Sequence, residues 1–238
     1  MPSSSRRNAA GPAPDFAETA RLEGVEFGYA QGPRVLRDID LILARGSFHF
    51  LTGPSGAGKS SLLRLLHLAA RPSSGRLTLF GEDVSLIRRR DAPRLRRRIG
   101  VVFQDFRLME HLSVFDNAAL PLRLSGRRPA DYTPDVHEML RWVDLGGRMD
   151  DLPATLSGGE KQRLAIARAV IGKPDLILAD EPTGNVDAAM GGRLLRLFQG
   201  LNQMGATVLI ASHDQGLAER SGAALLRLEN GRLNGGGA

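Results

Sequence analysis

The sequence has no cysteine among its 238 residues, which excludes disulfide bonds and thiolate metal sites. No segment approaches the roughly 18 to 20 consecutive apolar residues that a membrane-spanning helix requires. The five histidines are scattered along the chain, and no two of them stand at the spacing of metal ligands. From these absences we expect a soluble, cytoplasmic protein.

Lysine and aromatic residues are also scarce. The basic residues are 29 arginines and only 3 lysines, aromatic residues make up 5% of the chain, and the formal net charge is +6. Seven arginines crowd into one short segment: Arg88, Arg89, Arg90, Arg94, Arg96, Arg97 and Arg98. This cluster would suit nucleic acid or an anionic membrane surface, and a solvated helix face ahead of a strand explains it as well. Because no aromatic residue interleaves with the arginines for base stacking, we expect no nucleic-acid partner.

The apolar residues, 42% of the chain, are enough to bury one substantial core, so we expect a single domain. Residues 1–19 are dominated by Ser, Arg, Pro and Ala, show no apolar periodicity and lack the hydrophobic centre of a signal peptide. We therefore expect a disordered tail at 1–19, the folded domain at 20–232 and a short second tail at 233–238.

Short apolar runs alternate with helical patterns, which predicts an α/β domain with a largely parallel central sheet. The expected strands are 21–27, 39–43, 48–52, 77–80, 100–103, 176–179, 207–212 and 224–228. The expected helices are 59–69, 114–122, 134–143, 158–170, 188–203 and 215–221. Between residues 105 and 169 the strand signals vanish, so we expect a helical insertion into the sheet.

One glycine-rich segment fits the phosphate-binding loop of nucleotide-binding proteins. Its residues are Gly53, Pro54, Ser55, Gly56, Ala57, Gly58, Lys59 and Ser60. The segment follows a predicted strand and precedes a predicted helix, as the mechanism requires. The glycines let backbone N–H groups surround the α and β phosphates, Lys59 reaches the β and γ phosphates, and the Ser60 hydroxyl binds Mg²⁺.

Two carboxylates, Asp180 and Glu181, follow the buried apolar run 176–179. They are expected at the carboxyl edge of the sheet, where open α/β folds bind their ligands. Asp180 suits Mg²⁺ coordination, and Glu181 suits polarising an attacking water. A carboxylate pair after a strand also serves as an ordinary helix cap, but a phosphate loop in the same chain favours the catalytic interpretation.

Three further residues follow predicted strands. His213 can touch the γ phosphate at the same sheet edge, and Gln104 can hold the attacking water or the metal. Either residue alone would more often be a surface group or a local cap, so their shared position carries the hypothesis. Tyr29 offers a ring for stacking on adenine, while core or surface packing explains it equally well.

A second candidate anion site lies about a hundred residues after the first, at Leu156, Ser157, Gly158, Gly159 and Glu160. Small residues and free backbone N–H groups at a helix N-terminus favour anions. Taken alone, a serine N-cap explains the segment. Together with the phosphate loop, it suggests one nucleotide shared by two sites.

These motifs, in this order over about residues 20–230, closely resemble the ATP-binding-cassette (ABC) ATPases. The resemblance implies a P-loop NTPase fold of the α/β class, in which an antiparallel β subdomain accompanies the mostly parallel central sheet. It implies a helical subdomain, about residues 105–169, that carries the signature segment around Ser157. It also implies hydrolysis of ATP, with ATP and Mg²⁺ as the cofactors.

The resemblance gives each motif residue a role. Glu181 becomes the catalytic base, His213 the switch histidine, Gln104 the Q-loop residue and Asp187 the D-loop aspartate. The implied metal ligands are Ser60, Gln104 and Asp180. The implied ATP-binding residues are Tyr29, the loop from Gly53 to Ser60, and Ser61, which stands where threonine is common. In a second copy, Ser157, Gly158, Gly159 and Glu160 would close over this ATP, giving a head-to-tail homodimer.

Within this family, residues 50–66, 99–124 and 178–187 look most like the ATP-binding proteins of bacterial cell division. That resemblance implies an integral membrane partner that controls cell-wall hydrolases, and a peripheral location on the cytoplasmic face of the inner membrane. The partner is expected in a groove beside Gln104 and the helices of residues 105–122. The ATPase subunits of lipoprotein-releasing, macrolide-efflux or amino-acid transporters are the alternatives. Nucleic-acid-associated ABC ATPases are more distant, because no coiled coil separates the two phosphate signals here.

Overall fold

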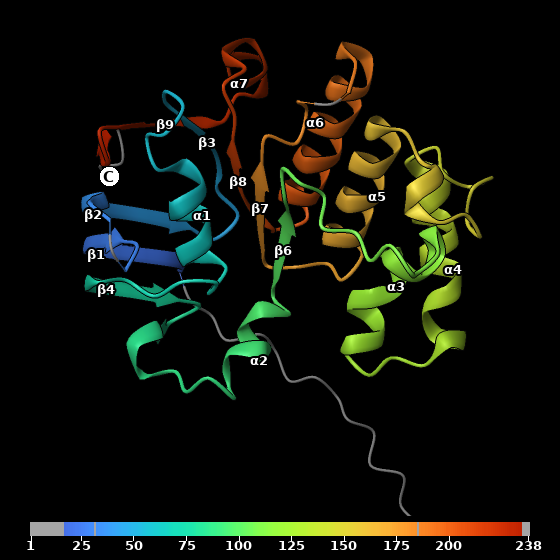
Figure 1. The fold of residues 1–238 in the computed structure, drawn as a ribbon, viewed down its shortest axis with the longest axis horizontal. Helices are drawn as coiled ribbons and strands as arrows, with labels where there is room; N and C mark the ends of the chain where they lie inside the picture. Colours follow the sequence, from blue (N-terminus) through green and yellow to red (C-terminus); the bar gives the residue numbers. More distant parts are fainter. Residues whose placement is uncertain (1–16, 31, 185, 235–238) are drawn as a thin grey trace, which may run out of the picture.

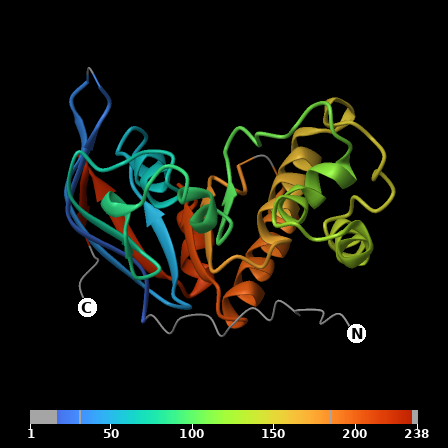
Figure 2. The ribbon, with the colours of Figure 1, turned by 90° about the horizontal axis from the view of Figure 1, so that it is seen from below.

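The structure contains two β-sheets and, standing apart from them, a group of helices (Figure 1). This computed structural model describes residues 17–30, 32–184 and 186–234. The sheets and the separate helices occupy opposite sides of the molecule, as Figure 2 shows from below. The expected α/β domain with a helical insertion is therefore confirmed.

The larger sheet has six strands in the order β10-β9-β3-β8-β7-β6. Its strands are β3 (Phe48–Thr52), β6 (Ile99–Val102), β7 (Leu176–Asp180), β8 (Thr207–Ala211), β9 (Ala224–Glu229) and β10 (Arg232–Asn234). All pairs are parallel except β10 with β9. Every residue of β8 is buried, as expected of a parallel strand that is covered on both faces.

The smaller sheet is antiparallel, in the order β2-β1-β4-β5. Its strands are β1 (Glu18–Gly28), β2 (Arg34–Ala44), β4 (Ser74–Leu79) and β5 (Glu82–Asp83). Along β2, buried apolar residues alternate with exposed ones, which is the pattern of a sheet with one buried face. This sheet is the antiparallel β subdomain that the family resemblance implied.

The predicted tails at 1–19 and 233–238 are wrong at their inner ends. Glu18 and Thr19 already belong to β1, and Leu233 and Asn234 belong to β10. These residues are held by backbone pairing to a neighbouring strand, which apolar periodicity does not reveal. Residues 1–16 and 235–238 of the predicted tails lie outside the described residues.

Helices cover both faces of the larger sheet. Helix α1 (Lys59–Leu66) lies between the two sheets, where Leu62 and Leu65 join a core shared with both. On the opposite face, α6 (Ala188–Gln203) and α7 (Gln215–Ser221) pack on β7 and β8 through residues such as Leu194 and Phe198. The short elements are η1 (Val84–Leu86), α2 (Ala92–Arg96) and η2 (Pro153–Thr155). In the described part of the chain, no helix has the length and hydrophobicity to cross a bilayer.

The helical subdomain has an apolar core of its own. It consists of α3 (Val114–Leu124), α4 (Pro129–Trp142) and the first part of α5 (Gly158–Val170). Helix α5 also reaches the core beneath the larger sheet through Ile166 and Val170, so it links the two halves of the molecule. The predicted start of a helix at residue 134 is wrong, because Pro129 occupies the first turn of α4, where a missing N–H costs nothing.

Asn117 on α3 anchors the loop that leads from the larger sheet to the helical subdomain. The residue is fully buried, and its Oδ1 accepts a hydrogen bond from the Met109 N–H at 2.8 Å. Its Nδ2 lies 3.0 Å from the carbonyl oxygens of Met109, Leu112 and Ser113. One buried amide therefore satisfies several backbone groups of this loop.

We expect Asn117→Ala to lower the free energy of unfolding by about 1–3 kcal/mol, because it leaves buried backbone groups without a partner. Denaturant titration followed by circular dichroism measures the change. The matched control on the same helix is Arg123→Ala, which removes an exposed ion pair with Asp116 worth about 0–1 kcal/mol. A loss for Asn117→Ala no larger than that of the control would contradict the anchoring role.

Candidate functional site

The loop between β3 and α1 forms a cradle in which two positions can be occupied only by glycine. Gly58, the N-cap of α1, has a φ of 111° and provides no side-chain cap, so the first N–H groups of the helix stay available. Gly53 has a φ of 146°, and a Cβ there would lie 2.0 Å from the Leu228 carbonyl oxygen. A Cβ at Gly58 would lie 2.8 Å from the Leu36 side chain. The predicted phosphate-binding loop thus depends on its glycines for steric reasons.

Lys59 folds back over this cradle. Its Nζ donates hydrogen bonds to the carbonyl oxygens of Gly53 at 2.7 Å and Pro54 at 3.1 Å. The ammonium group is therefore held at the mouth of the loop, with a third donor direction free to meet an anion. This position matches the role expected of a phosphate-binding lysine.

The loop opens into a cavity of about 500 Å³ that collects the ends of three strands. Gln104 follows β6, Asp180 and Glu181 lie at the end of β7, and His213 follows β8. The cavity is lined by Val35, Ser55, Gly56, Gly58, Lys59, Ser60, Ser61, Gln104, Asp180, Glu181, Gly184 and His213. The structure thus brings together the residues that the sequence places at separate strand ends.

Glu181 and His213 contact each other across the cavity. His213 Nδ1 lies 2.9 Å from Glu181 Oε2, and the His213 backbone N–H donates to the same oxygen at 3.4 Å. Glu181 adopts a φ of 47°, in the left-handed region that non-glycine residues seldom enter. Its N–H nonetheless donates to the Ala211 carbonyl, so the β-ladder holds this strained residue in place.

Asp180 lies deeper than Glu181 and beside Ser60. Burial raises the pKa of the Asp180 carboxyl above its ordinary value, the hydrogen bond from Ser60 opposes this rise, and the neighbouring Glu181 charge adds to it. Among the described residues, no group of three or more His, Asp or Glu side chains could hold a metal alone. The oxygen donors of Ser60, Asp180 and Gln104 instead fit Mg²⁺, which commonly takes one or two carboxylates and completes its shell with phosphates and water.

Tyr29 stands at the rim of the site and does not line the cavity. Its ring packs edge-on against Phe27, its surface is 48% exposed, and its hydroxyl lies 3.2 Å from the Ser61 hydroxyl. Sequence reasoning missed Val35, an apolar lining residue on β2. No sequence signal marks Val35, because an apolar residue in an alternating strand is indistinguishable from an ordinary core residue.

The second predicted anion site lies at the start of α5 and contributes nothing to this cavity. Ser157 caps the helix in a capping box, since its side chain accepts from the Glu160 N–H and the Glu160 carboxylate accepts from the Ser157 N–H at 2.8 Å. These bonds and Arg148 hold the pKa of Glu160 below its ordinary value. Gly158 is exposed, and a Cβ there would meet no atom within 4 Å.

Asp187 caps α6, where its side chain accepts a hydrogen bond from the Met190 N–H at 2.9 Å. The residue is exposed and does not line the cavity. Asn185, two residues before Asp187, lies outside the described residues.

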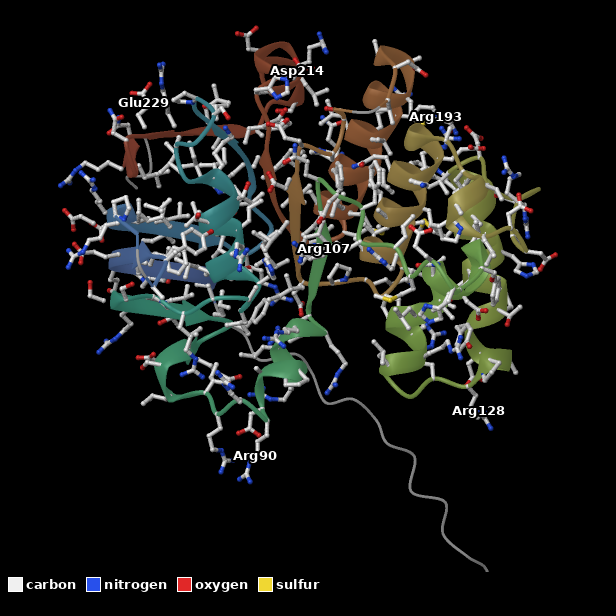
Figure 3. The ribbon with its side chains drawn as sticks, in the orientation of Figure 1. Arg90, Arg107, Arg128, Arg193, Asp214 and Glu229 are labelled. Carbon is white, nitrogen blue, oxygen red and sulfur yellow. The ribbon has the colours of Figure 1, made fainter. Side chains whose placement is uncertain are left out.

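A second cavity, of about 680 Å³, lies between β6 and α3. Its apolar lining includes Ile99, Val101, Phe103, Met109, Leu120, Leu122 and Leu124. The arginines that line it are Arg96, Arg97, Arg107, Arg127 and Arg168. Figure 3 shows Arg107 near the middle of the molecule, between the sheets and the helical subdomain. We call this cavity the subdomain groove.

Arg168 on α5 is the buried charge of the subdomain groove, with 9% of its surface exposed. Its guanidinium donates to the carbonyl oxygens of Arg107 and Phe106, each at 2.7 Å. Burial lowers its pKa, and no carboxylate in the described part of the chain pairs with it. Sequence reasoning missed Arg168, although an arginine four residues after Leu164 on an otherwise apolar helix face was a detectable signal.

Comparison with known proteins places the chain among nucleotide-binding cassettes. The sequence profile described as ABC transporter matches residues 36–184. The chain is 44% identical over 216 residues to the cell division ATP-binding protein FtsE of Escherichia coli (strain K12), covering 91% of this chain and 97% of that protein. It is 36% identical over 210 residues to FtsE of Bacillus subtilis (strain 168), covering 88% and 92%.

Solved structures give the same result. The dimeric structure of MJ0796, described as a bacterial ABC transporter cassette, matches with a TM-score of 0.85 and 32% identity, covering 90% of this chain and 96% of that one. A dimeric post-hydrolysis state of MJ0796 bound to ADP and Pi also matches with a TM-score of 0.85, at 30% identity, covering 92% and 99%.

The raised pKa of Asp180 should make the free energy of unfolding depend on pH. Because the folded state holds this proton more tightly than the unfolded state, the contribution of Asp180 to stability is present below the unfolded pKa of about 3.9 and is lost as the pH rises through the folded pKa. An asparagine in place of this aspartate would imitate its neutral form at every pH.

We therefore expect Asp180→Asn, measured without nucleotide or Mg²⁺, to raise the melting temperature at pH 7, with the gain shrinking toward pH 4. Thermal unfolding across this range tests it. The control is the exposed Asp150→Asn, for which we expect no such trend. A lower melting temperature for Asp180→Asn at pH 7 would contradict the burial argument.

Proposed function

The chain belongs to the ABC transporter family of ATP-binding proteins and is an FtsE-like ATPase, and from that premise we propose how its residues bind and hydrolyse ATP. The observation that carries the proposal is the separation of the two anion sites. The phosphate-binding loop and the catalytic side chains surround one cavity, whereas the capped start of α5 lies outside it. A second copy can therefore complete the cavity.

Within one protomer, the backbone N–H groups from Ser55 to Ser61 bind the α and β phosphates, and Lys59 binds the β and γ phosphates. The glycine geometry at Gly53 and Gly58 supports this role, because any side chain there would clash with the chain itself. Tyr29 lies at the rim, where its half-exposed ring is available to adenine. Ser60 and Asp180 bind Mg²⁺ with help from the Gln104 amide oxygen, and the cation supplies neutralisation of charge on the phosphates.

Glu181 acts as the base that takes a proton from the attacking water. Its contact with His213 at 2.9 Å orients the carboxylate, and the imidazole can in turn reach the γ phosphate at the same sheet edge. Gln104 positions the water or the metal from the end of β6. Asp187, exposed at the start of α6, is the residue through which the second protomer contacts this site.

In the dimer, Ser157, Gly158, Gly159 and Glu160 of one protomer close over ATP bound by the other. The exposed backbone of Gly158 and the helix N-terminus of α5 favour an anionic partner, and the capping box holds the segment rigid. The arrangement is head-to-tail, so two ATP molecules join two protomers. Hydrolysis separates them.

The subdomain groove receives the membrane partner, which by the FtsE resemblance is FtsX. The groove is apolar, and its arginines, Arg168 above all, favour a partner segment that carries a carboxylate. The loop after Gln104 borders both the groove and the cavity that binds ATP. Closure of the dimer over ATP therefore moves a wall of the groove. The ATPase thus works on the cytoplasmic face of the inner membrane and drives FtsX to regulate cell-wall hydrolysis at the septum.

We expect Glu181→Gln to lower the rate of ATP hydrolysis by about a hundredfold or more while ATP binding persists, because the general base is lost and the phosphate contacts stay. Steady-state phosphate release and equilibrium nucleotide binding measure the two effects. The exposed Glu219→Gln on α7 is the control and should keep the wild-type rate. Unchanged turnover in Glu181→Gln would remove the role given to Glu181.

A mixed dimer tests the head-to-tail arrangement. Lys59→Ala damages the phosphate-binding loop and Ser157→Arg damages the start of α5, so each homodimer should be inactive. Pairing one protomer of each kind restores one intact composite site of two, and we expect partial recovery of hydrolysis. Differently tagged protomers allow the mixed dimer to be isolated.

The matched control places both substitutions in one protomer and pairs it with a wild-type protomer. The head-to-tail arrangement then leaves no intact site, and hydrolysis should be lost. If the mixed single variants stay inactive and this control stays active, each site lies within one protomer and the arrangement is wrong.

A further inference from the structure

An arginine-rich surface lies on residues 86–97, which follow the last strand of the antiparallel sheet. It has no role in the ATP site proposed above. We call it the α2 patch and define it as Leu86, Arg89, Arg90 and Arg97. Figure 3 shows Arg90 projecting from the lower end of the molecule, below α2. The patch lies at the opposite end of the structure from α7, which Figure 1 shows at the top.

The segment that carries the patch is anchored firmly to the domain. Val84, Ile87 and Leu95 are buried and belong to the core between the sheets. The Arg71 guanidinium donates to the Ile87 carbonyl oxygen, and the Arg96 guanidinium donates to the Leu68 carbonyl oxygen at 2.8 Å. The exposed side chains of the patch are therefore presented from a fixed backbone.

Six of the seven arginines between residues 88 and 98 fall into two groups, and the seventh, Arg96, donates to the Leu68 carbonyl oxygen. Arg88, Arg94 and Arg98 have carboxylate partners within the chain, which are Asp91, Glu82 and Asp175. Arg89, Arg90 and Arg97 are exposed and form no ion pair with any residue that the structure describes. Of the four arginines here that form no ion pair with a described residue, Arg89, Arg90 and Arg97 belong to the α2 patch.

Leu86 adds an apolar contact to this charge. Its surface is 81% exposed, the highest value among the large hydrophobic residues of the described part of the chain. Leu86 lines the same surface hollow as Arg89. An exposed leucine beside an unpaired arginine fits the headgroup region of an anionic bilayer, where cations meet phosphate and an aliphatic side chain enters the acyl boundary. A surface for nucleic acid would benefit from aromatic rings, and the patch has none.

We propose that the α2 patch binds the anionic phospholipid headgroups of the membrane, with Leu86 entering the bilayer interface. The patch adjoins the subdomain groove, because Arg96 and Arg97 line that groove and Arg96 also lines a neighbouring surface hollow together with Arg89. The connection from this surface to a membrane partner rests on the proposed function, in which the groove holds a membrane protein. Lipid contact at the α2 patch would orient the ATPase toward that partner.

Vesicle co-sedimentation of the purified full chain, with no membrane partner present, tests the proposal. We expect binding to vesicles that contain phosphatidylglycerol and none to vesicles of phosphatidylcholine alone. The double variant Arg89→Gln/Arg90→Gln should lower the partition coefficient roughly 30-fold, since each basic side chain near an anionic surface contributes a factor of about five. Raising the salt concentration should weaken the charge-dependent binding.

Two further variants distinguish vesicle binding through the α2 patch from binding through the overall positive charge of the protein. Arg37→Gln/Arg141→Gln removes the same charge from exposed positions elsewhere, and we expect its partition coefficient to change less than about twofold. Leu86→Ser should lower partition severalfold at both low and high salt, because the apolar contribution is not screened.

Equal binding to both kinds of vesicle, or equal losses in the two double variants, would overturn the proposal. It would also be overturned if Arg89→Gln/Arg90→Gln weakened binding to RNA or DNA and left vesicle binding unchanged. None of these results bears on the roles of Glu181 or Ser157, whose tests contain no lipid. Failure of the lipid proposal and failure of the proposed function are therefore distinguishable.

Discussion

The parallel register of β3, β8, β7 and β6 is the constraint on which the rest of the structure depends. Leu51 and Asp180 both pair with Ala211, and Ala179 pairs with Val102, so the strands end at nearly the same level. Whatever follows the last residue of each strand must emerge at one edge of the sheet. For this reason the loop before Lys59 meets the two carboxylates, Gln104 and His213.

The same ladder positions the Glu181 carboxylate in detail. The Glu181 N–H continues the pairing by one residue beyond the strand, to the Ala211 carbonyl, while its φ turns into the left-handed region. That turn directs its side chain toward His213, which follows the strand that accepts the hydrogen bond. A strained residue persists here because the neighbouring strand over-determines its position.

Helix α5 connects the helical subdomain to the larger sheet. It begins at the capping box of Ser157, packs midway in the helical core and ends beneath the larger sheet. Arg168 on this helix holds the carbonyl groups of Phe106 and Arg107, in the loop that starts at Gln104. One short loop therefore forms part of both the cavity around Lys59 and the subdomain groove, which gives the two cavities a physical connection.

Much of this molecule could be predicted because its signals are local. A glycine-rich loop before a lysine, and polar residues at the ends of apolar runs, depend on only a few neighbouring residues. These local patterns were sufficient to predict the fold class and the side chains that meet at one edge of the sheet. The inner ends of the predicted tails and the lining role of Val35 depended on pairing and packing with distant segments, so no local pattern marked them. Two features became apparent only in the folded molecule: Ser157 lies outside the cavity of its own chain, and burial raises the pKa of Asp180. Both facts depend on how far apart packed elements stand and how much water they exclude, which no stretch of sequence contains.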